Sequence, residues 1–248
     1  CSQSMRPALS WASLKRMFTH ATVSAGITLL AGLPVSMLTT ARVEASKWSL
    51  PSSSTCEDSW SQSRATAGMA AAKVKRNEEL APDPERMALL QRIVMSSIGH
   101  HARFRSATLP HRVADVIFAR YQPEMTYGDH VDDPIMGTQG PRFRSDISMT
   151  LFLSDPAGYA GGELVIRTTF GEREVKLAAG SAVIYPSSSV HRVAPVTQGE
   201  RLVALTWIQS LVRDPARREL LFELDQAREH LLRSAPEAAE RPGTTGVP

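Results

Sequence analysis

The 248-residue sequence contains only two cysteines, little net charge and no internal repeat. Cys1 and Cys56 form neither a CxxC pair nor a disulfide framework, so the fold must be stabilised by its core, and we expect a reducing, cytoplasmic compartment. The formal net charge is +3, and lysines and arginines are scattered rather than gathered into a stripe. The sequence therefore gives no case for binding nucleic acid.

The sequence also lacks a long uninterrupted hydrophobic run. Residues 17–41 are moderately apolar and follow a Lys-Arg pair, but threonine, serine, glycine and proline interrupt them. A membrane span is therefore not expected. We interpret residues 1–60 as a loosely ordered N-terminal extension, with a targeting segment as the alternative. Residues 234–248, rich in proline and glycine, are predicted to be a disordered tail.

Between residues 112 and 212, short runs alternate with glycine-bearing turns. Residues 146–153 place Ile147, Met149 and Leu151 on one face and serine or threonine on the other, which is the period of a β-strand. The other runs of this kind are 114–121, 163–167, 172–177, 182–185 and 201–208. Short strands joined by glycine turns are typical of an antiparallel sandwich or barrel, and not of a parallel βαβ sheet.

Two helices are predicted to flank the strands, each beginning at an Asp-Pro pair. Asp83 and Asp214 are the N-caps, and the following prolines occupy the first helical positions. The apolar face of the first helix consists of Met87, Leu90, Val94 and Ile98. The apolar face of the second consists of Leu220, Leu224, Ala227 and Leu231. We expect the second face to pack against the sheet, which makes the predicted fold mainly β with flanking helices.

The residues that suggest chemistry begin with His130 and Asp132, directly after a strand-like run. Side chains two positions apart on an extended backbone point to the same face, so this imidazole and carboxylate can converge. His191 is the candidate third ligand. Two histidines and a carboxylate with open positions form the facial triad of non-haem Fe(II) oxygenases. Catalytic zinc also uses such a set, but its helical H-E-x-x-H signature is absent.

Arg201 follows His191 by ten positions and is the candidate partner for an anion. A guanidinium suits the distal carboxylate of a chelating keto acid, because it donates two parallel charge-assisted hydrogen bonds. Each residue alone also has an ordinary interpretation: His130 can cap a turn, His191 can be a structural histidine, and Arg201 can form a surface ion pair. The combination on one β architecture favours the metal site.

Several stretches of the chain, taken in order, match a known family. They include Thr126-Tyr-Gly-Asp-His-Val-Asp132, Arg144-Ser-Asp-Ile-Ser148, Thr150-Leu-Phe-Leu-Ser-Asp-Pro156, Gly161-Gly-Glu-Leu-Val165, Tyr185-Pro-Ser-Ser-Ser189 and Trp207-Ile-Gln-Ser210. Residues 65–233 resemble the PKHD-type hydroxylases, bacterial members of the prolyl-4-hydroxylase-like Fe(II)/2-oxoglutarate dioxygenases. Residues 1–60 do not share this resemblance, and the helical sequence of the family is cut short after Arg233.

The resemblance implies a double-stranded β-helix (jelly-roll) core within a domain at 61–233, with the catalytic core at about 112–212. It implies that His130, Asp132 and His191 bind Fe(II) and that Arg201 binds 2-oxoglutarate. The expected reaction uses dioxygen, converts 2-oxoglutarate to succinate and CO2, and hydroxylates an unidentified substrate. L-ascorbate is expected to re-reduce the iron.

Two tyrosines near the first histidine keep two interpretations each. Tyr121 resembles the tyrosine that lines the cosubstrate pocket in prolyl hydroxylases, and a cross-strand aromatic is the alternative. Tyr127 is interpreted as a packing or lid residue. For the whole chain, the alternative is a non-catalytic cupin-like jelly-roll module that binds a metal or ligand and does not need Arg201. A third interpretation is an inactive relative with altered ends.

Overall fold

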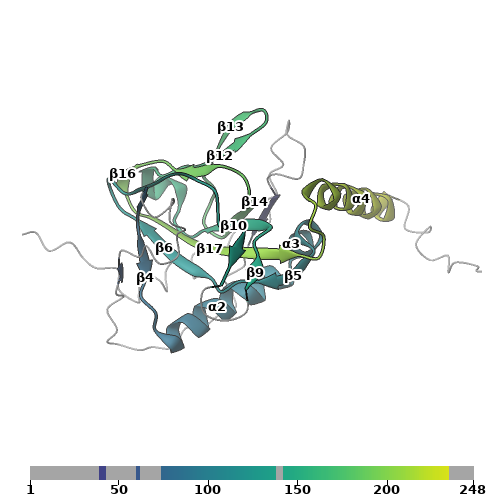
Figure 1. The fold of residues 1–248 in the computed structure, drawn as a ribbon, viewed down its shortest axis with the longest axis horizontal. Helices are drawn as coiled ribbons and strands as arrows, with labels where there is room; N and C mark the ends of the chain where they lie inside the picture. The colour runs from purple at the N-terminus through teal and green to yellow at the C-terminus, as the bar shows by residue number, and fades with distance from the viewer. Residues whose placement is uncertain (1–38, 43–59, 62–73, 138–141, 235–248) are drawn as a thin grey trace, which may run out of the picture.

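The computed structural model describes residues 39–42, 60–61, 74–137 and 142–234. The predictions for the N-terminal extension and the C-terminal tail fall almost wholly outside these residues and stay predictions. Within them the chain is mainly antiparallel β-sheet with helices at its sides, so the predicted fold class is confirmed (Figure 1). Two facing sheets form the jelly-roll core. Among the described residues, no helix is long and apolar enough to cross a bilayer.

The larger sheet has eight strands in the order β1-β14-β10-β17-β6-β4-β2, with β5 also paired to β17. Its strands are β1 (Thr39–Arg42), β2 (Trp60–Ser61), β4 (Glu78–Leu80), β5 (Pro110–Val113), β6 (Ile117–Tyr121), β10 (Ile147–Phe152), β14 (Ser181–Pro186) and β17 (Arg201–Ser210). Each pairing in this sheet is antiparallel, as the glycine-bearing turns predict.

The smaller sheet has five strands in the order β13-β12-β15-β7-β3. They are β3 (Lys75–Arg76), β7 (Thr126–His130), β12 (Leu164–Thr168), β13 (Gly171–Val175) and β15 (His191–Val193). Two short antiparallel pairs complete the β structure: β8 (Ile135–Met136) with β9 (Phe143–Arg144), and β11 (Tyr159–Gly161) with β16 (Val196–Gly199), the 3-10 turn η2 (Pro156–Gly158) preceding β11. The β12–β13 hairpin projects from the body of the molecule (Figure 1).

Helices α2 (Pro84–Gly99) and α3 (Ala102–Thr108) cover the outer face of the larger sheet. Helix α2 begins at the predicted cap, because the Asp83 side chain accepts a hydrogen bond from the backbone nitrogen of Arg86 at 2.8 Å. Its buried Leu90, Val94 and Ile98 belong to one apolar cluster with residues on that outer face of the sheet. The predicted apolar face of this helix is therefore the face that packs.

Strand β10 shows why the strand pattern matters for the site. Ile147, Met149 and Leu151 join the apolar cluster beneath α2, whereas Ser148 and Thr150 line the space between the two sheets. All six residues of β10 are buried. The alternation in β10 therefore directs apolar side chains to the face beneath α2 and hydroxyl side chains to the face that lines the cavity, and neither face is exposed to solvent.

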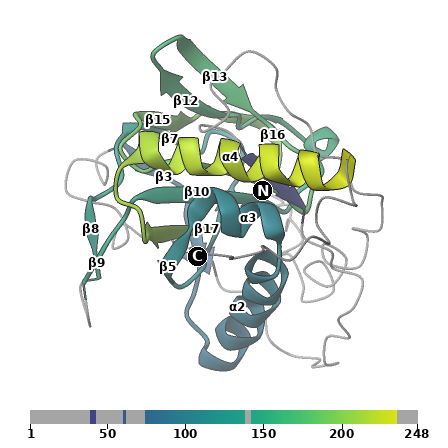
Figure 2. The same ribbon diagram turned by 90° about the vertical axis from the view of Figure 1, so that its right-hand side faces the viewer.

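Helix α4 (Pro215–Ser234) begins where predicted, with Asp214 accepting from the backbone nitrogen of Arg217 at 2.9 Å. The prediction that Leu220, Leu224 and Leu231 pack against the sheet is wrong, since they are 55%, 57% and 66% exposed. Only two residues of α4, at positions 218 and 222, are buried. The reason is that α4 lies beside α3 and extends away from the strands (Figure 1 and Figure 2).

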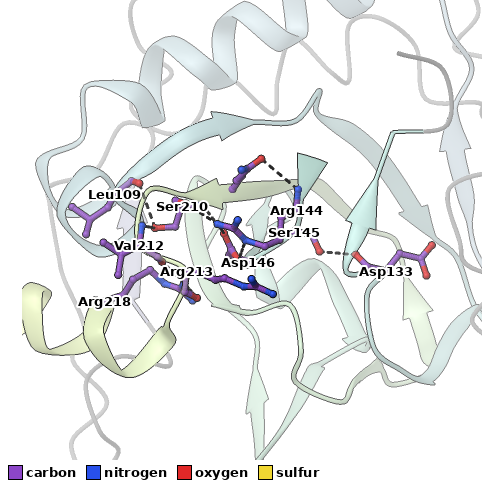
Figure 3. A network of polar contacts seen from close by, with 10 residues as sticks. Leu109, Asp133, Arg144, Ser145, Asp146, Ser210, Val212, Arg213 and Arg218 are labelled. Carbon is purple, nitrogen blue, oxygen red and sulfur yellow. Dashed lines mark hydrogen bonds and ion pairs between the residues drawn. The ribbon is translucent and has the colours of Figure 1, made fainter. Parts of the chain in front are cut away.

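A network of polar contacts joins β9, β17 and the chain at Asp133 (Figure 3). Arg144 donates to both carboxylate oxygens of Asp146, at 2.6 and 2.8 Å, and to the carbonyl of Ser210 at 3.0 Å. The same carboxylate accepts from the backbone nitrogen of Ser210 at 2.9 Å. The Ser145 hydroxyl donates to the carbonyl of Asp133 at 2.6 Å. The network therefore fixes the backbone directly after the predicted carboxylate ligand.

Replacing Asp146 by alanine tests this network. The substitution leaves the buried Ser210 amide without its acceptor, which should lower the free energy of unfolding by about 1–3 kcal/mol. Urea denaturation measures the change. The matched control is Asp225→Ala, which removes a partly exposed i,i+3 ion pair with Arg228 on α4 and should change the free energy by less than about 1 kcal/mol. Equal effects of the two substitutions would contradict a stabilising role for the network.

Candidate metal and cosubstrate site

The antiparallel pairing of β7 with β15 places His130 directly opposite His191. Asp132 follows His130 by two residues, and one ligand atom from each of the three side chains lies within 4.8 Å of the others. The Nε2 atom of His130 is 3.9 Å from Oδ1 of Asp132, and Nε2 of His191 is 3.8 Å from Oδ2. The structure thus brings together the three residues that the sequence singled out.

Hydrogen bonds to the backbone orient both imidazoles. Nδ1 of His130 lies 2.7 Å from the carbonyl of Gly128, and Nδ1 of His191 lies 3.0 Å from the carbonyl of Ser189. Because a carbonyl only accepts, each Nδ1 must carry the proton in the neutral ring. Each Nε2 therefore presents its lone pair toward Asp132, which is the arrangement that metal-binding histidines need.

Two serines orient the carboxylate, and their sequence positions alone do not indicate this role. The Ser148 hydroxyl donates to Oδ2 of Asp132. The oxygen of Ser148 also lies 2.8 Å from that of Ser187. Since Ser148 has a single hydroxyl proton, Ser187 is the donor in the second contact. Ser148 lies within a stretch that resembles the family, but nothing in the sequence shows that β10 turns it toward Asp132.

The surroundings keep His130 uncharged at neutral pH. Burial is the main cause, and together with the neighbouring His191 it lowers the pKa of His130 to about 4, although Asp132 acts in the opposite direction. A neutral imidazole is the form that ligates a metal ion. Tyr127 stacks on the same ring, with the ring centroids 3.7 Å apart and the planes 13° apart. Tyr127 therefore packs against a candidate ligand.

Arg201 lies in the interior at the start of β17, opposite Tyr121 of β6. It is 1% exposed, and neither Nε nor Nη1 has a hydrogen-bond partner among the described residues. The guanidinium carbon lies 4.9 Å from the centre of the Tyr121 ring. Burying a charge without a counterion is unfavourable, so this environment suits an anionic ligand.

Two tyrosines accompany Arg201. Burial raises the pKa of Tyr121 to about 12, against the opposing effect of the Arg201 charge, so its hydroxyl stays protonated at neutral pH. Tyr121 lies opposite Arg201 on the neighbouring strand and also lines the cavity. The two interpretations of Tyr121 from the sequence, a cross-strand aromatic and a pocket residue, are therefore compatible. Tyr159 was missed by the sequence analysis. Its buried hydroxyl lacks a partner among the described residues, and burial raises its pKa although the nearby Arg201 opposes this.

Gly162 makes room for this arrangement. A Cβ atom at this position would lie 2.9 Å from Cγ2 of Val196, 3.0 Å from Cδ of Arg201 and 3.2 Å from Cε2 of Tyr159. The backbone also has φ +69°, which side-chain-bearing residues rarely adopt. The Gly-Gly pair, interpreted from the sequence as a turn, therefore also gives Arg201 and Tyr159 their space.

The residues present fit both groups that the sequence suggested. Two imidazole nitrogens and a carboxylate oxygen converge without any other His, Cys, Asp or Glu side chain joining the group within the described chain, which is the donor set of a facial-triad iron site. The buried guanidinium, unpaired at two nitrogens, fits a carboxylate. Both lie along one cavity between the sheets, which Tyr121, Tyr185 and Leu164 also line.

Known proteins are similar to this chain over more than two thirds of its length. The model of the 2OG-Fe(II) oxygenase superfamily matches residues 116–209. A PKHD-type hydroxylase of Thioalkalivibrio sulfidiphilus is 52% identical over 175 residues, which are 71% of this chain and 78% of that protein. A PKHD-type hydroxylase of Synechococcus elongatus is 49% identical over 168 residues, 68% of this chain and 75% of that protein.

Among solved structures, a prolyl-4-hydroxylase of Pseudomonas putida is 21% identical, with a TM-score of 0.38 over 56% of this chain and 75% of that chain. The family assignment rests on the closer sequence relatives and the superfamily match. These relatives favour the enzyme over the non-catalytic cupin-like module. The chain belongs to the PKHD-type hydroxylases of the 2OG-Fe(II) oxygenase superfamily and is a 2-oxoglutarate-dependent dioxygenase.

Proposed function

We propose that His130, Asp132 and His191 bind the Fe(II) of this dioxygenase, and that Arg201 binds the distal carboxylate of 2-oxoglutarate. One observation carries the proposal: a guanidinium that is 1% exposed and unpaired at Nε and Nη1 shares a cavity with a converging His-Asp-His group. The third reactant is a substrate that is hydroxylated at a C–H bond.

When bound, Fe(II) supplies the activation of dioxygen that is coupled to decarboxylation of 2-oxoglutarate to succinate and CO2. The residues of the chain bind and orient the reactants. Backbone acceptors at Nδ1 keep the two imidazoles aimed, and Ser148 keeps the Asp132 carboxylate in place. The distal carboxylate would lie against Arg201, which fixes the direction in which the keto acid enters.

Tyr121 and the apolar lining determine the polarity of the cavity. With a pKa of about 12, Tyr121 donates a hydrogen bond without adding a negative charge beside the bound anion. Leu164 and Val193 line the same cavity and exclude water from it.

We include L-ascorbate in the proposal as the reductant that restores Fe(II) after turnovers without substrate. Ascorbate should then prolong the release of succinate measured in the absence of substrate.

Replacing His191 by alanine removes one proposed iron ligand. Succinate release and the visible band formed by Fe(II) and 2-oxoglutarate without oxygen should both fall, by more than the roughly 10–100-fold typical of losing a group that only orients a ligand. His111→Ala, at an exposed position of β5, is the control and should behave as wild type. Wild-type turnover of His191→Ala would remove this residue from the metal site.

Replacing Arg201 by alanine removes the proposed carboxylate partner. The dissociation constant of 2-oxoglutarate, measured by anaerobic titration of the visible band, should rise about 10–100-fold, because a hydrogen bond to a charged group contributes about 1.5–3 kcal/mol. Binding of Fe(II) alone should not change. The control is Arg167→Ala, whose side chain is 54% exposed. An unchanged affinity for 2-oxoglutarate would mean that another cation binds this carboxylate.

Gly162→Ala tests the space around Arg201 without removing its charge. The added methyl group should displace the Arg201 and Tyr159 side chains and weaken 2-oxoglutarate binding at least about tenfold, one hydrogen bond to a charged group being the smallest expected loss. Gly158→Ala is the matched control, because a Cβ there meets nothing within 4 Å. The same anaerobic titration compares the two variants, and equal affinities would show that Arg201 tolerates the crowding.

A further inference from the structure

One wall of the cavity is polar and comes from the segment that contains β3 and β4. Lys75, Asn77 and Glu79 of this segment line the cavity together with His130 and Arg201, and all three are buried. Strand β3 pairs with β7 of the smaller sheet, and β4 pairs with β6 of the larger one. The segment therefore passes from one sheet to the other and closes the side of the cavity.

This polar wall lies outside the part of the chain that the whole superfamily shares. The superfamily match covers residues 116–209, which include the proposed iron ligands, Tyr121 and Arg201. Residues 75–79 precede it by more than thirty positions. Binding of Fe(II) and 2-oxoglutarate is common to the superfamily, so a wall outside the common region is suited to the reactant that differs between its members.

Asn77 is the residue of this wall that lacks partners. It is 3% exposed, and neither its oxygen Oδ1 nor its nitrogen Nδ2 has a hydrogen-bond partner among the described residues. Its neighbours Lys75 and Glu79 form an ion pair with each other. Asn77 adjoins the hydroxyl of Tyr121, and a weak side-chain hydrogen bond from Asn77 slightly opposes the rise in the pKa of that phenol, but neither amide atom has a contact of ordinary hydrogen-bond geometry. A buried amide with both ends unpaired is unfavourable in the protein alone and points to a ligand.

The chemistry of the amide excludes 2-oxoglutarate as its full partner. Ionised 2-oxoglutarate offers two carboxylates and a ketone, all of which only accept hydrogen bonds. It can therefore pair with the N–H groups of Asn77 but not with Oδ1. Satisfying both ends requires a ligand group with a donor beside an acceptor, and another amide has that pair at matching spacing. The adjacent ion pair carries no net charge, which agrees with a neutral group.

We propose that Asn77 is a substrate-binding residue that pairs with an amide group of the molecule to be hydroxylated. This inference rests on the proposed function, since it assigns the third reactant of the same cavity. The paired amides would lie beside Tyr121, between the wall formed by residues 75–79 and the iron site. The substrate class is then a compound with an amide, such as a peptide bond, near the carbon that is hydroxylated.

Asn77 is the only asparagine in the sequence, which permits a direct measurement. Protein labelled with [15N]asparagine, loaded with Zn(II) in place of Fe(II) and with 2-oxoglutarate, shows one side-chain amide pair in its NMR spectrum. N-methylacetamide and methyl acetate are the two probes, because they have nearly the same shape and only the first has an N–H donor. We expect N-methylacetamide to shift the Asn77 resonances saturably and to bind at least about fivefold more tightly than the ester.

Two variants separate substrate binding from a structural role. In Asn77→Leu, binding of N-methylacetamide, followed by ligand-observed NMR, should lose its preference over the ester. The isosteric Asn77→Asp keeps an oxygen that accepts from the N–H and should keep this preference. In Asn77→Leu the affinity for 2-oxoglutarate should stay within about twofold of wild type, since no pairing with it is lost. The melting temperature of Asn77→Leu should be no lower than that of wild type, because the substitution removes an unpaired buried amide. A lower melting temperature would assign Asn77 a structural role instead.

The remaining outcomes are distinct. Equal binding of ester and amide, or unmoved Asn77 resonances, would overturn the inference while leaving the proposed function intact. A tenfold loss of 2-oxoglutarate affinity in Asn77→Leu would place Asn77 in the cosubstrate site and also overturn it. If wild-type protein forms no visible band with Fe(II) and 2-oxoglutarate, the proposed function itself fails.

Discussion

The antiparallel register between β7 and β15 is the constraint on which the site depends. It places His130 opposite His191, and β12 fixes β15 from the other side by pairing Ile166 with His191. Because side chains alternate between faces, a shift of one residue would turn one imidazole out of the interior. The hydrogen bonds at Nδ1 and the network at Asp146 then refine positions that this pairing has already set.

The interior between the sheets holds an apolar cluster that includes Phe152, Ile166 and Val203, and buried polar groups lie beside it. Arg201, Asn77 and Tyr159 each present buried polar atoms without partners among the described residues. Unpaired buried polar groups lower the free energy of unfolding of the ligand-free protein. The fold tolerates them because other parts of the structure supply enough stability. The apolar cluster between α2 and the outer face of the larger sheet, which includes Leu90, Met149 and Ile208, lies on the opposite side of β10 and β17. The outer face of these strands therefore contributes stability away from the unpaired polar groups, while their inner face carries both apolar contacts and the proposed ligand site.

Sequence reasoning reached the strands, the helix starts and the site residues that carry a distinctive type or spacing. The Asp-Pro caps and the alternation in β10 are local signals, and the structure follows them. The packing of α4 is not local. A helical repeat of Leu220, Leu224 and Leu231 shows that one face is apolar, but it does not show what covers that face. The described neighbours of α4 leave it exposed, because the helix lies beside α3.

The residues that the sequence did not reveal are those whose role comes from tertiary position alone. Ser148 and Tyr159 are ordinary strand residues until the sheets face each other. This difference has a functional consequence. Iron and 2-oxoglutarate are the same for every member of the superfamily, so their ligands keep recognisable types and spacing within residues 116–209. Asn77, the residue proposed to bind the variable reactant, lies outside that region, and its unpaired amide within the cavity is what identifies it.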